Sequence, residues 1–135
     1  MILSIGSIDD IENFDELAKE HWDSFNNKKP AFKKEFLRTG KVITARKDTV
    51  VGYLIYFVFN SPYYDEKWCQ VDMYYIQPKF RKQGIGKKMF TMLEQKAKEC
   101  GCSRIVSSFN LKQPLEYFYK SIGYDNTHIA VAKEI

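Results

Sequence analysis

The segment Arg81–Lys88 places two glycines among basic residues, a combination suited to holding a phosphate group. It reads Arg-Lys-Gln-Gly-Ile-Gly-Lys-Lys, follows Pro78 and opens a stretch with helical spacing. Free N–H groups at a helix N-terminus carry partial positive charge, and glycines let an anion approach the backbone. The segment therefore predicts a cradle for an anion such as a pyrophosphate.

The spacing of these glycines excludes two common phosphate-binding motifs. The chain contains no Gly-x-x-x-x-Gly-Lys-Ser/Thr pattern, and a Gly-x-Gly-x-x-Gly pattern that starts at Gly84 fails at Met89. A lone Gly-x-Gly is a weak signal, because a tight turn before a basic helix has the same sequence.

With its flanks, the segment resembles the acetyl-CoA-binding segment of the GNAT superfamily of N-acetyltransferases. That signature is a strand, a proline, and then Arg/Gln-x-x-Gly-x-Gly/Ala at the start of a long helix. Arg81, Gly84 and Gly86 fill its fixed positions. Downstream, residues 117–124 (Tyr-Phe-Tyr-Lys-Ser-Ile-Gly-Tyr) resemble the Phe-Tyr-x-x-x-Gly-Phe/Tyr ending of the family. The similarity covers about residues 68–124.

The resemblance implies acetyl-CoA (coenzyme A) as the cofactor. In GNAT proteins two strands splay apart, and the pantetheine arm inserts between them. The backbone of the strand before the loop would bond the pantetheine amides, and Lys82, Lys87 and Lys88 would add contacts to the ribose phosphate. Asn110 resembles the cofactor-binding asparagine of the family, although asparagine also forms turns. The implied cofactor-binding residues are Tyr75, Ile76, Arg81, Lys82, Gln83, Gly84, Ile85, Gly86, Lys87 and Asn110.

Acyl transfer to an amine needs a base, because an alkyl ammonium has a pKa near ~10.4 and must lose a proton before it attacks. Asp72 lies four residues before Ile76, where many family members carry a catalytic glutamate. The resemblance therefore implies Asp72 as the base, directly or through water, and its shorter side chain favours the water relay. The alternative is that Asp72 bonds neighbouring backbone or tyrosine side chains and only shapes the site.

A proton donor at the sulfur would help the thiolate of coenzyme A to leave, since thiols have pKa values near ~8.5. By its place in the downstream motif, Tyr119 matches the general-acid tyrosine of the family. Tyr117 competes for this role, but helical spacing places Tyr119 with Leu115 and Ile122 on the inner side. Packing on an amphipathic helix is the alternative for both tyrosines.

The elements that must position these residues are read from periodicity and from helix and strand end signals. Strict alternation places Asp72, Tyr74 and Ile76 on one face of their strand, opposite Val71 and Met73. The whole chain, residues 1–135, is expected to form one α/β domain with the GNAT fold, in which helices flank a mixed, largely antiparallel sheet splayed at the cofactor site. We predict helices over about 8–25 (capped at Ser7), Pro30–Gly40, 84–100 and Pro114–Gly123, and strands over 42–46, 50–59, 68–76, 104–110 and 128–132.

Composition fits a single domain without a membrane span or a metal. Of the 135 residues, 44% are hydrophobic and 16% aromatic, enough to fill one core. The most apolar stretch, Val50–Phe59, is shorter than the ~20 residues that cross a bilayer, and no export signal precedes Asp9. The three cysteines form no Cys-x-x-Cys pair, so we expect neither a disulfide framework nor a zinc site, in a cytoplasmic protein.

Charge is segregated along the chain and raises the question of the acceptor. Residues 9–23 hold seven acids and one base, residues 28–47 eight bases and one acid, and residues 79–104 eight bases and two acids. The leading hypothesis is acetyl transfer to a primary amine, of a small molecule or a protein, by direct attack in a ternary complex. The aromatic and basic block 28–47 motivates an alternative, transfer to a nucleic-acid base or an aminoacyl group on RNA.

A non-catalytic CoA-binding module is the third hypothesis, and the presence of both Asp72 and Tyr119 argues against it. We expect a monomer or homodimer whose residues 20–36 and 60–67 line the acceptor site. Within that region His21 is interpreted as a surface or helix-face residue and Trp22 as core, and neither receives a catalytic role.

Overall fold

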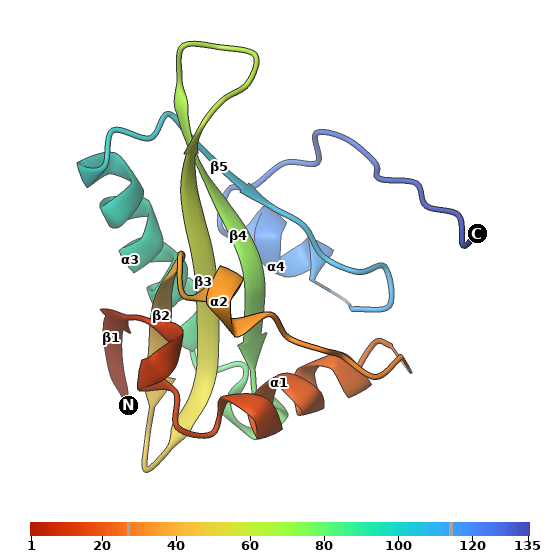
Figure 1. Cartoon of the computed structure of the whole chain (residues 1–135). Coiled ribbons are helices and arrows are strands. Elements are labelled where there is room, and N and C mark those ends of the chain that lie inside the picture. The colour runs from red at the N-terminus through yellow and green to blue at the C-terminus, as the bar shows by residue number, and fades with distance from the viewer. Residues whose placement is uncertain (27, 114) are drawn as a thin grey trace.

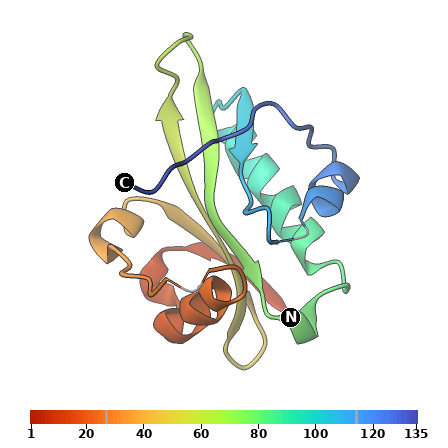
Figure 2. The ribbon, with the colours of Figure 1, turned by 90° about the vertical axis from the view of Figure 1, so that its right-hand side faces the viewer.

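The computed structural model describes residues 1–26, 28–113 and 115–135, and its centre is a five-stranded sheet with helices on both faces (Figures 1 and 2). Neighbouring strands follow the order of the sequence. The first four are antiparallel, and the fifth is parallel to the fourth, so the predicted mixed, largely antiparallel sheet is confirmed. The strands are β1 (Ile2–Gly6), β2 (Lys41–Arg46), β3 (Val50–Asn60), β4 (Lys67–Ile76) and β5 (Arg104–Ser107).

Each face of the sheet buries its own hydrophobic cluster beneath a pair of helices. Figure 2 shows α1 and α2 on one side of the sheet and α3 and α4 on the other. Leu17 and Tyr53 belong to the cluster on the α1 side, and Leu54 and Phe90 to the cluster on the α3 side. The helices are α1 (Phe14–Asp23), α2 (Lys34–Leu37), α3 (Ile85–Glu99) and α4 (Glu116–Ser121), with 3-10 turns at Ile8–Asp10 and Pro78–Phe80. No helix in the described ranges is long and apolar enough to cross a membrane.

The helix predicted over 8–25 is in fact two separate pieces. The predicted capping box exists, since the N–H of Ser7 donates to the Asp10 carboxylate at 2.8 Å, but it caps only the short 3-10 turn. Ile11 then adopts an extended conformation, and α1 begins at Phe14.

The helix predicted from Pro30 to Gly40 is also shorter, because only Lys34–Leu37 is helical. The ring of Phe32 packs at 5.5 Å from Phe14 and at 5.0 Å from Trp22. These contacts with α1 hold the preceding segment outside the helix. Phe36, within this short helix, is 58% exposed.

A β-bulge in β4 changes which side chains share a face of the sheet. Pairing with β3 passes directly from Met73 to Val71, so Asp72 is an extra residue without a partner on β3. As a result Val71 packs with Ile76 on the α3 side, whereas Met73 packs on the α1 side. The strict alternation predicted from sequence is wrong here, because the extra residue shifts the pattern by one.

The C-terminal part of the chain differs most from expectation. β5 ends at Ser107 rather than at residue 110, and residues 125–135 form no helix or strand, so the strand predicted over 128–132 is wrong. Strand propensity at Ile129 and Val131 is not enough, because a strand also needs a hydrogen-bonding neighbour. The helix start predicted at Pro114 lies outside the described residues, and α4 begins at Glu116.

Candidate active site

β4 and β5 separate part of the way along their length (Figure 1). Their pairing runs from Trp68 opposite Arg104 to Val71 opposite Ser107, and it stops there. β4 continues through residues 72–76 with no partner from β5. The backbone along that edge is therefore left unpaired within the sheet, which is the splay that the sequence predicts.

The loop between β4 and α3 presents a row of unused backbone donors. In the described part of the chain, none of the six N–H groups from Lys82 to Lys87 has a hydrogen-bond acceptor, whereas the next N–H, of Lys88, donates to the carbonyl of Gly84 at 3.1 Å. Lys82 and Gly84 adopt left-handed φ angles of 61° and 80°, a feature of backbone nests that bind anions. Consecutive free donors at the positive end of a 15-residue helix form an anion cradle.

The two glycines of this loop are required for different reasons. Gly84 has open space where a Cβ would stand, so its left-handed φ is what favours glycine there. At Gly86 a Cβ would overlap the Tyr74 hydroxyl and lie 3.1 Å from the ring of Phe118. Gly86 therefore allows the helix start to approach β4 and α4 closely.

The side chain of Arg81 turns back from the loop to the end of β4. Its Nε donates to the carbonyl of Ile76 at 2.7 Å, and its guanidinium carbon lies 5.3 Å from the centre of the Tyr75 ring. The arginine thus fixes the spacing between the unpaired edge of β4 and the row of free N–H groups.

Tyr119 lies at the point where the two strands part. Its hydroxyl is 2.7 Å from the Oγ of Ser107, the last residue of β5 that pairs with β4. Burial raises the pKa of the Tyr119 phenol above its usual value of 10.0, and the hydrogen bond with Ser107 opposes that change. Tyr117, its competitor, is 85% exposed.

Sequence reasoning missed Ser107, which is polar where Ile105 and Val106 are not. The available signal is a hydroxyl directly after the apolar pair Ile105 and Val106.

Asp72, the bulged residue, directly follows the last paired residue of β4, so Asp72 and Tyr119 flank the same point of divergence. The carboxylate of Asp72 makes no hydrogen bond or ion pair with any other described residue. The alternative in which Asp72 bonds neighbouring backbone or tyrosine side chains is therefore not what the structure contains. Asp72 lies at the surface, but neighbouring protein atoms partly desolvate the carboxyl and raise its pKa above the usual 3.8.

Asn110 forms a turn beyond the end of β5. Its Oδ1 accepts the N–H of Lys112 at 2.9 Å, and its carbonyl accepts the N–H of Gln113 at 2.8 Å. The turn-forming alternative is therefore what the structure contains, and a cofactor bond from the side-chain amide stays a prediction.

His21 lies on the buried face of α1, so its interpretation as a surface residue is wrong and that as a helix-face residue is correct. Its Nδ1 lies 2.5 Å from the hydroxyl of Tyr53, and its ring stacks on Tyr75. Desolvation, with a smaller effect of the Arg81 charge, lowers the pKa of His21 from 6.5 to about 4. The available signal was helical spacing, since His21 follows Phe14 and Leu17 on the apolar side of α1.

The two segments expected to line the acceptor site lie at different ends of the molecule. Residues 60–67 form the tip of the β3–β4 hairpin, at the opposite end of β4 from Ile76 (Figure 1). At ~3.3 Å per residue the strand separates the hairpin tip from Ile76 by about 30 Å, and a role of residues 60–67 at the acceptor site stays a prediction. A shallow surface concavity of about 540 Å³ lies where α1 ends, lined by Asp23, Ser24, Phe25, Asn26 and Lys112.

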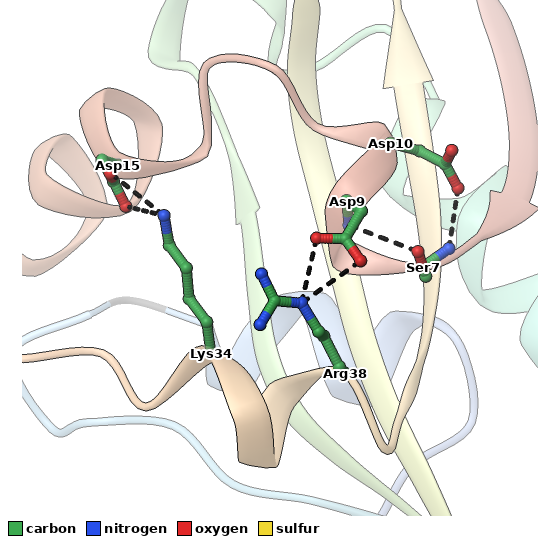
Figure 3. A network of polar contacts seen from close by, with 6 residues as sticks. All are labelled: Ser7, Asp9, Asp10, Asp15, Lys34 and Arg38. Carbon is green, nitrogen blue, oxygen red and sulfur yellow. Dashed lines mark hydrogen bonds and ion pairs between the residues drawn. The ribbon is translucent and has the colours of Figure 1, made fainter.

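The acidic and basic blocks of the sequence pair with each other. Lys34 lies 3.0 Å from Asp15, and Arg38 lies 3.1 Å from Asp9 (Figure 3). Arg46 likewise bonds Glu12 at 2.6 Å. Such exposed pairs contribute little to stability, because water and salt screen the charges. Three of the eight bases of the block over 28–47 are therefore paired with acids of the first block.

Comparison with known proteins gives a consistent result. The family model described as "Acetyltransferase (GNAT) family" matches residues 8–124. No curated protein sequence matches the chain significantly.

Among solved structures, a ribosomal-protein-alanine N-acetyltransferase from Brucella melitensis biovar Abortus 2308 superposes with a TM-score of 0.80 at 21% identity, over 100% of both chains. The aminoglycoside acetyltransferase meta-AAC0020 from an uncultured soil metagenomic sample, in complex with sisomicin, gives 0.76 at 17% identity, over 99% of this chain and 95% of that one. The aminoglycoside N-acetyltransferase AAC(6')-Iy in complex with CoA superposes with a TM-score of 0.76 at 14% identity, over 99% of this chain and 98% of that one. At these low sequence identities, the superpositions show that the fold is shared and nothing more.

Proposed function

Given that the chain belongs to the GNAT acetyltransferase family and is an acetyl-CoA-dependent acetyltransferase, we propose that it acetylates a primary amine by direct attack in a ternary complex. The observation that carries this proposal is the row of six free N–H groups from Lys82 to Lys87, placed beside the unpaired edge of β4.

The residues present fit coenzyme A. The free N–H groups would hold the diphosphate, and the backbone of Tyr75 and Ile76, in the part of β4 that does not pair with β5, would bond the pantetheine amides. Lys82 and Lys87 would add positive charge near the phosphates. Bound acetyl-CoA supplies an acetyl group already activated as a thioester.

Asp72 is the proposed base for the incoming ammonium. Its carboxylate bonds no described group, so it is available to take a proton directly or through water. The raised pKa of Asp72 narrows the gap to the amine, whose conjugate acid has a pKa near ~10.4, and makes the carboxylate a stronger base than a fully solvated one.

Tyr119 is the proposed donor at the departing sulfur. Because burial raises the pKa of its phenol, full proton transfer to a thiolate with a conjugate acid near ~8.5 is uphill. Hydrogen bonding to the developing negative charge is therefore its main contribution, and Ser107 orients the hydroxyl for it.

The proposed acceptor is a primary amine of a small molecule or a protein. The similar structures include acetyltransferases of aminoglycosides and of a ribosomal protein, which span both classes. The basic block gives less support to transfer to nucleic acid than its composition suggests, since three of its eight bases, Lys34, Arg38 and Arg46, already pair with acids.

A thiol-release assay with acetyl-CoA and a panel of amines tests the proposal. The panel should contain polyamines, aminoglycosides, amino acids and peptides with free N-termini. We expect turnover with at least one amine, and a loss of kcat of about 10²- to 10⁴-fold in Asp72→Asn and Tyr119→Phe. The exposed Tyr117→Phe is the matched control and should stay within about twofold of the parent, the usual scale for a group outside the reaction. Losses below tenfold in both test variants would refute the assigned roles.

A further inference from the structure

We propose that His21 is a positioning residue for cofactor binding, acting through the side chain of Tyr75; this inference rests on the proposed function. We name the four residues Glu20, His21, Tyr75 and Arg81 the Tyr75 clamp. The clamp fixes the position of the end of β4 relative to the free N–H groups of the loop.

Three different contacts fix the side chain of Tyr75. The imidazole of His21 stacks on its ring, with centroids 4.6 Å apart and planes inclined by 19°. Its hydroxyl donates to the Glu20 carboxylate at 2.8 Å. The guanidinium of Arg81 lies 5.3 Å from the ring centre. Two partners therefore come from α1, and one comes from the cofactor loop.

His21 is itself held by a partner on the neighbouring strand. Its Nδ1 is 2.5 Å from the hydroxyl of Tyr53, which is fully buried and lies directly opposite Tyr75 in the β3–β4 register. An aliphatic residue at position 21 would fill the space but leave the Tyr53 hydroxyl buried without this partner, at a cost in stability. The ring of His21 also packs edge-on against Trp22 at 4.9 Å.

The clamp connects to the cofactor site through Arg81. The same side chain that lies over the Tyr75 ring donates to the carbonyl of Ile76 at 2.7 Å. Movement of the Tyr75 ring therefore moves the anchor of the loop as well as the backbone at the end of β4. These are the two parts of the site that must hold coenzyme A at the same time.

Loosening the clamp should weaken binding more than chemistry. Asp72 and Tyr119 lie where the strands diverge, next to the paired part of the sheet, and are supported by β5 and α4. The clamp supports the far end of β4. We therefore expect KM for acetyl-CoA to rise while kcat changes little, because the reacting groups keep their own supports.

Calorimetric titration of the full chain with coenzyme A tests this inference. His21→Ala should raise the Kd at least tenfold. His21→Phe should stay within about threefold, because an aromatic ring restores the stacking on Tyr75. Tyr75→Phe keeps the ring but loses the bond to Glu20, so it should raise the Kd less than Tyr75→Leu, which loses every contact of the clamp. Steady-state kinetics of the same variants should show the change in KM and not in kcat.

Leu17→Ala is the matched control, since it removes a buried side chain of α1 that is not part of the clamp. It should lower the unfolding midpoint without changing the Kd, which separates positioning from general stability. If His21→Ala does not fold, the pair Tyr75→Leu and Tyr75→Phe decides in its place.

Equal Kd values for the parent and the disrupting variants would overturn the clamp while leaving the proposed function intact. An equal loss of affinity in Leu17→Ala would also overturn it. Failure of the parent itself to bind coenzyme A would overturn the proposed function, and the clamp with it.

Discussion

Protonation of His21 should destabilise the protein in mildly acidic solution. The folded state lowers the pKa of this imidazole to about 4 from 6.5, because the ring is desolvated between aromatic side chains and lies near Arg81. Between pH 6.5 and pH 4, His21 is therefore mostly protonated in the unfolded chain and mostly neutral in the folded chain. Stability contributed by the neutral imidazole is complete above pH 6.5 and is lost as the pH falls toward 4.

The size of the effect follows from the pKa values of His21 in the folded and unfolded chain. A difference of one in pKa corresponds to about 1.36 kcal/mol, and the linkage relation gives a loss of about 2 kcal/mol at pH 5 and about 3 kcal/mol at pH 4. Such a loss is a large share of the ~5–15 kcal/mol that stabilises a typical domain.

Urea denaturation followed by circular dichroism, at intervals from pH 4.5 to 7.5, measures this dependence. As the pH is lowered from 7.5 to 4.5, the free energy of unfolding of the parent should fall relative to that of His21→Phe, which carries no titrating ring. His128→Gln, a change in the exposed C-terminal segment, is the control and should follow the parent. The lowered pKa of Glu12, held by Arg46, acts below pH 4.5 and is common to all three proteins. Parallel curves for the parent and His21→Phe would refute the burial of a neutral imidazole.

Three further predictions concern two residues of the site, Gly86 and Ser107, and one exposed ion pair, that of Arg46. Gly86→Ala should destabilise the fold by about 1–3 kcal/mol and weaken coenzyme A binding, because the new Cβ overlaps the Tyr74 hydroxyl. Adding Tyr74→Phe should recover part of both losses, as denaturation and calorimetry can measure. Ser107→Ala should lower kcat by roughly tenfold without affecting the Kd for coenzyme A, because Tyr119 loses the group that orients its hydroxyl. Arg46→Ala should leave the urea midpoint nearly unchanged, since its ion pair is exposed, and a clear drop in that midpoint would contradict the assignment.

The parts of the fold that sequence predicts well are those set by local rules. Gly84 and Gly86 lie where the loop needs a left-handed turn and a close approach, so the motif marks the start of α3 within one residue. The strands from β2 to β4 follow from runs of β-branched and aromatic residues. Helical spacing alone favours Tyr119 over Tyr117 as the inward-facing tyrosine, and the structure agrees, since Tyr119 is buried and Tyr117 is exposed.

The parts that sequence does not reveal depend on contacts between distant segments. The bulge at Asp72 arises from pairing with β3, and nothing in the order of β4 residues marks it. His21 is buried because Tyr53 and Tyr75, more than 30 positions away, supply a hydrogen bond and a stacking surface. A histidine on a helix carries no sign of such partners. The strand expected over 128–132 fails for the same reason, because propensity cannot supply a neighbour.

The central claim is that the free backbone N–H groups of residues 82–87 hold the diphosphate of coenzyme A. Amide nitrogen–proton NMR spectra recorded during titration with coenzyme A, and separately with pantetheine, test it directly. Coenzyme A should shift these six amide signals strongly, while pantetheine, which lacks the diphosphate, should leave them nearly unchanged. Saturation with coenzyme A that leaves the six signals in place would contradict the account.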